Sequence, residues 1–212
     1  MGIAERKERE KERRKKEIIN AAEKVFFKLG FDYASVEKVA EKAELSKATL
    51  YLYFKSKDEL YFAICMRAQE KMYKLIDEAL SEAKNTVEKI ESLFYSIVEF
   101  QKLYPDYFRT MFHFQTHPMA IDPDSEMAIE NKKIDQIYIN HWITLVEKGK
   151  KEGIIRKDLD PVTTVLIFWM QLSGFLKMYS VLQSELDKKF HISEERLLKD
   201  YFKIIFDGIK TT

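Results

Sequence analysis

Basic, hydroxyl and aromatic side chains gather in residues 46–55, SKATLYLYFK. Lysine, threonine and tyrosine are residue types that donate hydrogen bonds to base edges and phosphate oxygens of nucleic acids. Leu50 and Phe54 are four residues apart and therefore share one arc of a helix, which we expect to be buried. The other arcs carry Lys47, Ala48, Thr49, Tyr51 and Tyr53. The pattern indicates an α-helix with one core face and a polar, aromatic outer surface.

Two capped helices are predicted to position this surface. Ser35 precedes an apolar-periodic run that begins at Val36, and Ser46 precedes the run that contains Leu50. A serine hydroxyl at either place can accept a hydrogen bond from the open N–H groups of the first turn. Only Glu44 and Leu45 remain between the two helices, so the segment is a predicted helix-turn-helix.

A major groove admits an α-helix whose first residues reach base edges. We therefore expect Lys47, Ala48 and Tyr51 to read bases, and Thr49 and Tyr53 to contact phosphates. Lys57, at the head of the next helix, is a further candidate for a phosphate contact. The full set of candidate DNA-binding residues is Ser35, Lys47, Ala48, Thr49, Tyr51, Tyr53 and Lys57.

The stretch SKATLYLYFKSKDEL resembles the recognition-helix signature of the TetR family of transcriptional regulators, roughly S-x-G-T-L-Y-x-Y/H-F-x-S-K-E-x-L. The resemblance is dense across residues 18–64 and weaker afterwards. Ala48 stands where the family often has Gly or Pro. Glu44 stands where the family usually has Gly, and a left-handed backbone there costs a residue with a Cβ about 1 kcal/mol. The resemblance implies a DNA-binding head, a homodimer and a pocket for an inducer.

Composition favours an all-α, soluble chain. The 212 residues are 46% hydrophobic and include only six Gly and four Pro, which is typical of long helices rather than a turn-rich β fold. A single cysteine, Cys65, excludes an internal disulfide framework. We find neither a signal-peptide pattern nor an apolar run long enough to span a bilayer, so we expect a cytoplasmic protein.

Charge and helix pattern divide the chain into two predicted domains. Residues 1–57 hold 15 Lys or Arg against 10 Asp or Glu, so the basic end is the end with the helix-turn-helix. We expect a DNA-binding domain over residues 1–56 and a helical effector-binding and dimerisation domain over residues 57–212. Within the first, residues 1–17 form a charged extension, which is either a solvated helix or a basic arm that touches DNA.

The second domain contains an aromatic and methionine-rich set that is predicted to line a pocket for a small apolar or aromatic effector. Such side chains at helical spacing also form ordinary cores, and that alternative stays open. His141, Gln171 and Arg109 are candidates for polar groups in the pocket. The candidate ligand-binding residues are Phe94, Tyr107, Phe108, Met111, Phe112, His113, Trp169 and Phe175.

Two C-terminal helices, residues 161–184 and 193–210, carry broad apolar surfaces. The resemblance implies that these helices form a homodimer contact across a two-fold axis, and the stripes we expect in it are Trp169, Leu172, Phe175, Leu176, Leu198, Tyr201 and Ile205. Burial inside one subunit is the alternative. Gly174 would permit close approach of two helices there.

The sequence thus predicts a ligand-responsive regulator, most simply a repressor released from a near-palindromic DNA operator. We find no nucleophile motif, no phosphate-binding loop and no cofactor motif, so we do not expect an enzyme. Two alternatives remain. One is a DNA-binding protein without an inducer. The other is a metal sensor that uses His113 and His117, which are spaced i,i+4.

Overall fold

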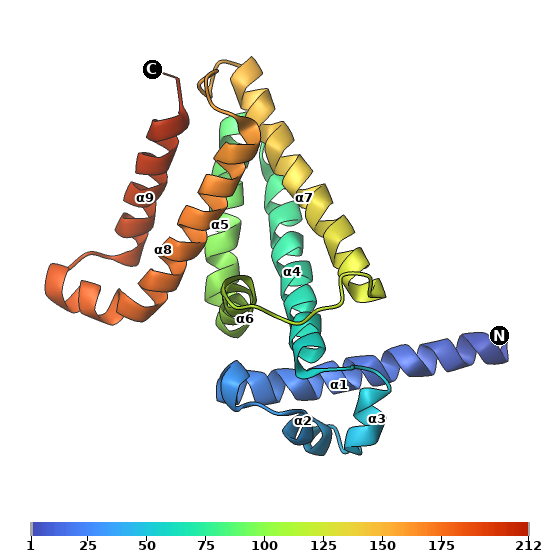
Figure 1. The fold of residues 1–212 in the computed structure, drawn as a ribbon. Coiled ribbons are helices and arrows are strands. Elements are labelled where there is room, and N and C mark those ends of the chain that lie inside the picture. The colour runs from blue at the N-terminus through green and yellow to red at the C-terminus, as the bar shows by residue number, and fades with distance from the viewer. Residues whose placement is uncertain (1, 212) are drawn as a thin grey trace. The chain divides into compact units, whose positions relative to one another are not determined.

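The computed structural model describes residues 2–211, except the side chains of residues 3 and 187, and that part of the chain forms helices without a β-strand (Figure 1). The predicted all-α fold, with a helix-turn-helix head followed by a helical domain, is confirmed. The helices are α1 (Ile3–Tyr33), α2 (Val36–Lys42), α3 (Lys47–Tyr51), α4 (Lys57–Glu82), α5 (Thr86–Leu103), α6 (Pro105–Thr116), α7 (Glu126–Lys151), α8 (Pro161–Phe190) and α9 (Glu194–Ile209).

Helix α1 is interrupted at Gly30. Gly30 has φ 76° and ψ 172°, a conformation that a residue without a Cβ adopts at little cost. The chain then makes one more turn to Tyr33, and the Ala34 N–H donates to the Gly30 carbonyl oxygen at 3.2 Å. The glycine therefore bends the chain toward α2 instead of terminating the helix.

By internal contacts, the chain divides into two compact units. The head unit comprises Met1–Gln69 and Asp106–Ile129, and the C-terminal unit comprises Glu70–Pro105 and Glu130–Thr212. The division falls within α4 and not at its start, so α4 belongs to both units. The functional boundary at residues 56 and 57 stays a prediction.

The head unit is built on one apolar core. Ile18, Val39 and Leu50 are fully buried in it, so α1, α2 and α3 each contribute to the same core. The distant segment 106–129 joins this unit, because the Tyr107 hydroxyl donates to the Glu23 carboxylate at 2.6 Å and partly buried apolar side chains of the segment pack on the core.

The C-terminal unit combines an apolar core with a polar link between α4 and α7. The Tyr73 hydroxyl donates to one carboxylate oxygen of Asp135 at 2.8 Å, and the Asn131 amide donates to the other at 2.8 Å. The Tyr73 ring stacks on the Tyr138 ring, whose hydroxyl donates to Asp77 at 2.7 Å. Burial raises the pKa of Asp135 and, with the Asp77 contact, the pKa of Tyr138 to about 12.

Helix α8 is more apolar than one packing partner requires. Residues Pro161–Leu186 are long and apolar enough, by length and composition alone, to cross a membrane, and 22% of that window is buried. Our expectation that no run of this kind exists is therefore wrong. A core helix of a soluble protein can pass the same test, so this finding does not by itself indicate a membrane span.

The Asp135 link makes stability depend on pH in a defined direction. A carboxyl whose folded-state pKa is raised binds more protons when folded, so this group should favour folding less as pH rises through the interval between its unfolded and folded pKa values. Asp135→Asn removes that titration. The new amide oxygen can still accept from the Tyr73 hydroxyl, and its NH2 group can donate to the Asn131 oxygen once the Asn131 amide flips. We expect Asp135→Asn to be within about 1 kcal/mol of the parent at pH 7, and Asp135→Ala to lose about 1–3 kcal/mol because two donors lose their acceptor.

Urea denaturation at several pH values measures these differences. As pH rises from 4 to 7, the unfolding free energy of the parent should fall relative to that of Asp135→Asn. An opposite slope would show that the carboxylate form is the one that the fold favours.

Candidate nucleic-acid interface

Both short helices of the head begin with the predicted serine caps. The Ser35 hydroxyl accepts from the Lys38 N–H at 3.3 Å, and the Ser46 hydroxyl accepts from the Thr49 N–H at 3.0 Å. The Ser46 and Thr49 hydroxyls also lie 2.8 Å apart. Each cap satisfies a donor that the first helical turn leaves open, which fixes where α2 and α3 start. The Ser35 hydroxyl oxygen, a candidate for DNA contact, thus already accepts a hydrogen bond at the start of α2.

The turn between α2 and α3 has a left-handed residue at Glu44, although glutamate stands where the family usually has glycine. Glu44 adopts φ 56°. Its N–H donates to the Glu41 carbonyl at 3.1 Å, and the Leu45 N–H donates to the Ala40 carbonyl at 2.9 Å. These two bonds are the 5→2 and 6→1 pair of a Schellman motif, which usually has glycine at the left-handed residue. The hydrogen bonds hold Glu44 in a conformation that a side chain disfavours by about 1 kcal/mol.

Helix α3 shows one face to the core and the others to solvent. Leu50 and Phe54 are buried, as predicted, while Lys47, Ala48 and Tyr51 are exposed. Thr49 and Tyr53 are half-buried on the flank. The structure therefore brings the proposed base-reading side chains together on one exposed surface, whose contact with DNA remains a prediction.

Lys47 is held by a partner that the sequence did not indicate. Its ammonium forms an ion pair with the Glu37 carboxylate of α2 and lies 5.8 Å from the centre of the Tyr51 ring. The Lys47 hydrogen bond is the largest cause of the lowering of the pKa of Glu37, to about 2, and the same contact raises the pKa of Lys47. The Lys47 side chain is 50% exposed and the Glu37 side chain is 59% exposed, so the ion pair opens readily.

Lys57 is also engaged within the head. Its ammonium donates to the Asp32 carbonyl oxygen at 3.4 Å and lies 4.2 Å from the centre of the Phe31 ring. The contact ties the start of α4 to the bend after Gly30. A phosphate contact by Lys57 would thus compete with a weak carbonyl bond and a cation–π contact.

Two residues near this surface were missed by the sequence analysis. Glu37 lies ten residues before Lys47, a separation that corresponds to no periodic contact, so only the packing of α2 against α3 reveals the pair. Lys38, on the same helix, donates to the Tyr33 carbonyl at 3.1 Å. Its basic charge beside the helix-turn-helix was the one available signal.

The candidate effector residues do not form one cluster within either unit. Tyr107, Phe108, Met111, Phe112 and His113 belong to the head unit, and Phe94, Trp169 and Phe175 belong to the C-terminal unit. Phe108 and Met111 are buried, and His113 lies against the rings of Phe31 and Tyr61. Phe94 and Phe175 both contact the Tyr201 ring, at 5.9 and 4.1 Å between centroids. These are core contacts, and a ligand-binding role for the set stays a prediction.

The two histidines considered for a metal are stacked on each other. The His113 and His117 rings lie 3.9 Å apart, and the His117 Nδ1 atom is 3.0 Å from the His113 carbonyl oxygen. Among the described residues, no group of three or more His, Cys, Asp or Glu side chains is arranged to hold a metal ion. In the part of the chain that the structure describes, this pair therefore lacks a third ligand.

The part of the chain that contains the helix-turn-helix matches a known family of proteins. Residues 18–64 match the domain described as bacterial regulatory proteins, tetR family. An uncharacterised HTH-type transcriptional regulator of Bacillus subtilis, YhgD, is 28% identical over 184 residues, covering 83% of this chain and 85% of that protein.

Two solved structures share the fold. The fatty acid degradation regulator FadR of Bacillus halodurans superposes with a TM-score of 0.64 at 21% identity, covering 91% of this chain and 98% of the other. AibR in complex with isovaleryl coenzyme A and operator DNA superposes with a TM-score of 0.61 at 17% identity, covering 77% and 86%. At these identities the likeness establishes the architecture and not the ligand.

A capped helix-turn-helix on a three-helix core, followed by a helical domain, defines the class of helix-turn-helix transcriptional regulators. Residues 18–64 carry the domain of the tetR family of bacterial regulatory proteins, and the chain is similar over most of its length to HTH-type transcriptional regulators.

The Glu37–Lys47 pair leads to a test of the base-reading face. Glu37 places a negative charge beside the surface that approaches phosphates, and it competes with DNA for the Lys47 ammonium. We expect Glu37→Gln to bind random-sequence DNA several-fold more tightly and to lower the ratio of operator to random affinity. Fluorescence anisotropy with both DNAs measures this ratio, and Glu41→Gln, an exposed change on the same helix without such a pair, is the control. An unchanged ratio would mean that the pair lies outside the DNA contact.

Proposed function

We propose that the protein is a homodimeric, ligand-responsive repressor, located in the cytoplasm, whose two heads occupy successive major grooves of a near-palindromic operator. The single observation that carries this proposal is the exposed α3 surface, where Lys47, Ala48 and Tyr51 face solvent while Leu50 anchors the helix in the core. A helix so anchored presents the same donors each time it enters a groove. The tetR-family assignment supports DNA as the partner.

An exposed apolar stripe on α8 supports the dimer. Leu166, Met170, Gly174 and Met178 recur every four residues, so they lie along one side of the helix. Met170 and Met178 are 62% and 57% exposed. Within the described residues, no heavy atom comes within 4 Å of where a Cβ on Gly174 would lie, so a second helix can approach closely there.

The stripe differs from the face that we expected to form the dimer contact. Leu172, Leu176 and Leu198 are buried within the chain, so they are core side chains and not interface side chains. The expectation was wrong for these three because helical periodicity groups residues by face but does not tell which face is covered. On α9 the most exposed large apolar side chain is Ile204, at 70%.

A repressor of this design needs an effector that binds the DNA-incompetent state more tightly, with a coupling of about 1–3 kcal/mol. The names of the two similar structures support small-molecule control in proteins of this fold, since one is titled a fatty acid degradation regulator and the other holds isovaleryl coenzyme A with operator DNA. We accordingly expect a small effector with an apolar or aromatic body to bind the C-terminal unit.

Selection of bound DNA from a random library tests the DNA-reading role. We expect a two-fold symmetric motif, and Lys47→Ala should relax the preference at one base pair per half-site by about 1–3 kcal/mol. Lys57→Ala should instead weaken all sequences about equally, because a phosphate contact carries no base information. Enrichment of an asymmetric motif, or a motif unchanged by Lys47→Ala, would contradict the assignment.

A charge on the α8 stripe tests the dimer. Met170→Glu would bury an unpaired carboxylate twice in a symmetric interface, which costs several kcal/mol per copy. We expect light scattering to show monomer and operator binding to fall to near non-specific affinity. Gln183→Glu, an exposed change off the stripe, should leave a dimer, and because Met170 is exposed within the chain both variants should keep the parent's circular dichroism. A Met170→Glu dimer would place the contact elsewhere.

A further inference from the structure

The C-terminal unit contains a groove with cationic side chains above an apolar floor. It has a volume of about 240 Å³ and combines residues of α4, α5 and α7. We call it the basic groove, and its lining residues are Leu80, Lys89, Leu93, His141, Trp142, Thr144, Leu145 and Lys148. Two lysines and a histidine line it, and no carboxylate is among these residues.

A smaller apolar cavity adjoins the basic groove. It measures about 40 Å³, and Leu93, Trp142 and Leu145 line both spaces, so these three side chains form a shared wall. The other lining residues are apolar except Thr164. A cavity with so few polar groups does not hold water well. An apolar ligand group that enters it supplies packing contacts that the empty cavity lacks.

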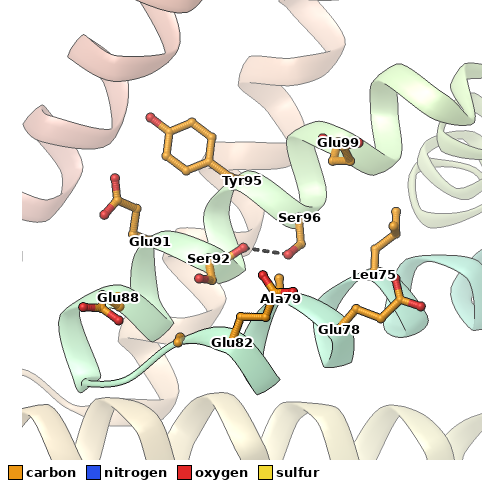
Figure 2. Close-up of a pocket in the computed structure, with 11 residues that line it drawn as sticks. Leu75, Glu78, Ala79, Glu82, Glu88, Glu91, Ser92, Tyr95, Ser96 and Glu99 are labelled. Atoms are coloured by element: carbon orange, nitrogen blue, oxygen red, sulfur yellow. Dashed lines mark hydrogen bonds between the residues drawn. The ribbon is translucent and has the colours of Figure 1, made fainter.

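A second groove in the same unit has the opposite charge. It has a volume of about 500 Å³, and Figure 2 shows the carboxylates around it. No lysine or arginine lines it, and its glutamates are Glu78, Glu82, Glu88, Glu91 and Glu99. Of these two grooves, the basic groove favours an anionic ligand and the glutamate-lined groove disfavours it.

The cations of the basic groove are available to a ligand. The ammonium of Lys148 lies 3.6 Å from the Glu152 carboxylate, and both side chains are exposed, so this pair contributes little and yields to a better partner. Lys89 lies in the second turn of α5 and His141 is exposed on α7. Lys89 on α5 and Lys148 on α7 thus line the same groove from two helices.

We propose that the basic groove binds an amphipathic anion. Its carboxylate or phosphate head lies between Lys89 and Lys148, and its apolar chain passes Trp142 toward the smaller apolar cavity. His141 and Thr144 supply additional hydrogen-bonding groups at the head. A neutral chain forgoes the charge-assisted bonds, and a cationic chain meets two lysines. The effector role of this ligand rests on the proposed function, but its binding does not.

Tryptophan fluorescence provides the readout, because the sequence contains only Trp142 and Trp169. Trp169→Phe leaves Trp142, which lines both spaces, as the sole reporter. We expect octanoate to change its emission saturably, to bind more tightly than butanoate, and to bind about tenfold or more tightly than octanol or octylamine. Octyl phosphate tests the other head group, and whichever of the two acids binds better identifies the head within the same chemistry.

Matched variants locate the binding site, with affinity measured by calorimetry on the full chain. Lys89→Gln combined with Lys148→Gln should weaken octanoate binding about tenfold or more and leave octanol binding unchanged. Glu91→Gln, in the second groove that glutamates line, should leave octanoate binding unchanged. Equal binding of octanoate, octanol and octylamine, or full octanoate affinity in the double variant, would overturn the proposal.

A separate measurement distinguishes this inference from the proposed function. Operator occupancy is followed with and without octanoate in the parent and in the Lys89→Gln, Lys148→Gln variant. Release in the parent alone supports both proposals. Octanoate binding without release confirms the site and removes the effector role, while failure of the parent to bind selected DNA removes the repressor and leaves the site intact.

Discussion

The burial of Leu50 and Phe54 is the contact on which the exposed α3 surface depends. Helix α3 has five residues, far fewer than an isolated helix needs in water. Its shape therefore comes from three external constraints, which are the Ser46 cap, the left-handed turn at Glu44 and the two apolar anchors. Together they fix both the start of the helix and its rotation, so that Lys47 and Tyr51 face outward.

Charge on this surface is already partly paired before DNA arrives. Lys47 meets Glu37, and Lys57 meets a carbonyl and an aromatic ring. Such exposed contacts are weak, and under the proposed function each would be exchanged for a DNA contact. In that proposal, the operator would offer Lys47 a base acceptor in place of the Glu37 carboxylate, and random sequence would offer a poorer one. The pairing can thus sharpen discrimination between sites while it lowers affinity overall.

The C-terminal unit divides its apolar surface among three uses. One face of α8 packs inside the chain through Leu172 and Leu176, another is exposed along Met170 and Met178, and a small cavity remains near Trp142. The apolar content that makes α8 resemble a membrane span is divided between the face that packs inside the chain and the exposed stripe. Adjacent to this core, α4 and α7 are joined by a part-buried hydrogen bond from the Tyr73 hydroxyl to the Asp135 carboxylate.

The sequence by itself determined the local structure of this protein. Helix starts followed from serine caps and from apolar periodicity, and the short gap at Glu44 and Leu45 predicted a tight turn between the two helices. These features depend on neighbours along the chain, which is why composition and spacing were sufficient to predict the all-α fold and the outward face of α3.

Only the tertiary structure decided which partner each side chain meets. Periodicity placed Leu172, Leu176, Met170 and Met178 on a broad apolar helix but did not tell which of them another helix covers. The Glu37–Lys47 pair, the packing of residues 106–129 with the head unit and the meeting of Lys89 with Lys148 in one groove depend on the angles at which helices cross. Those angles arise from side-chain packing summed over whole faces, and no short stretch of sequence specifies that sum.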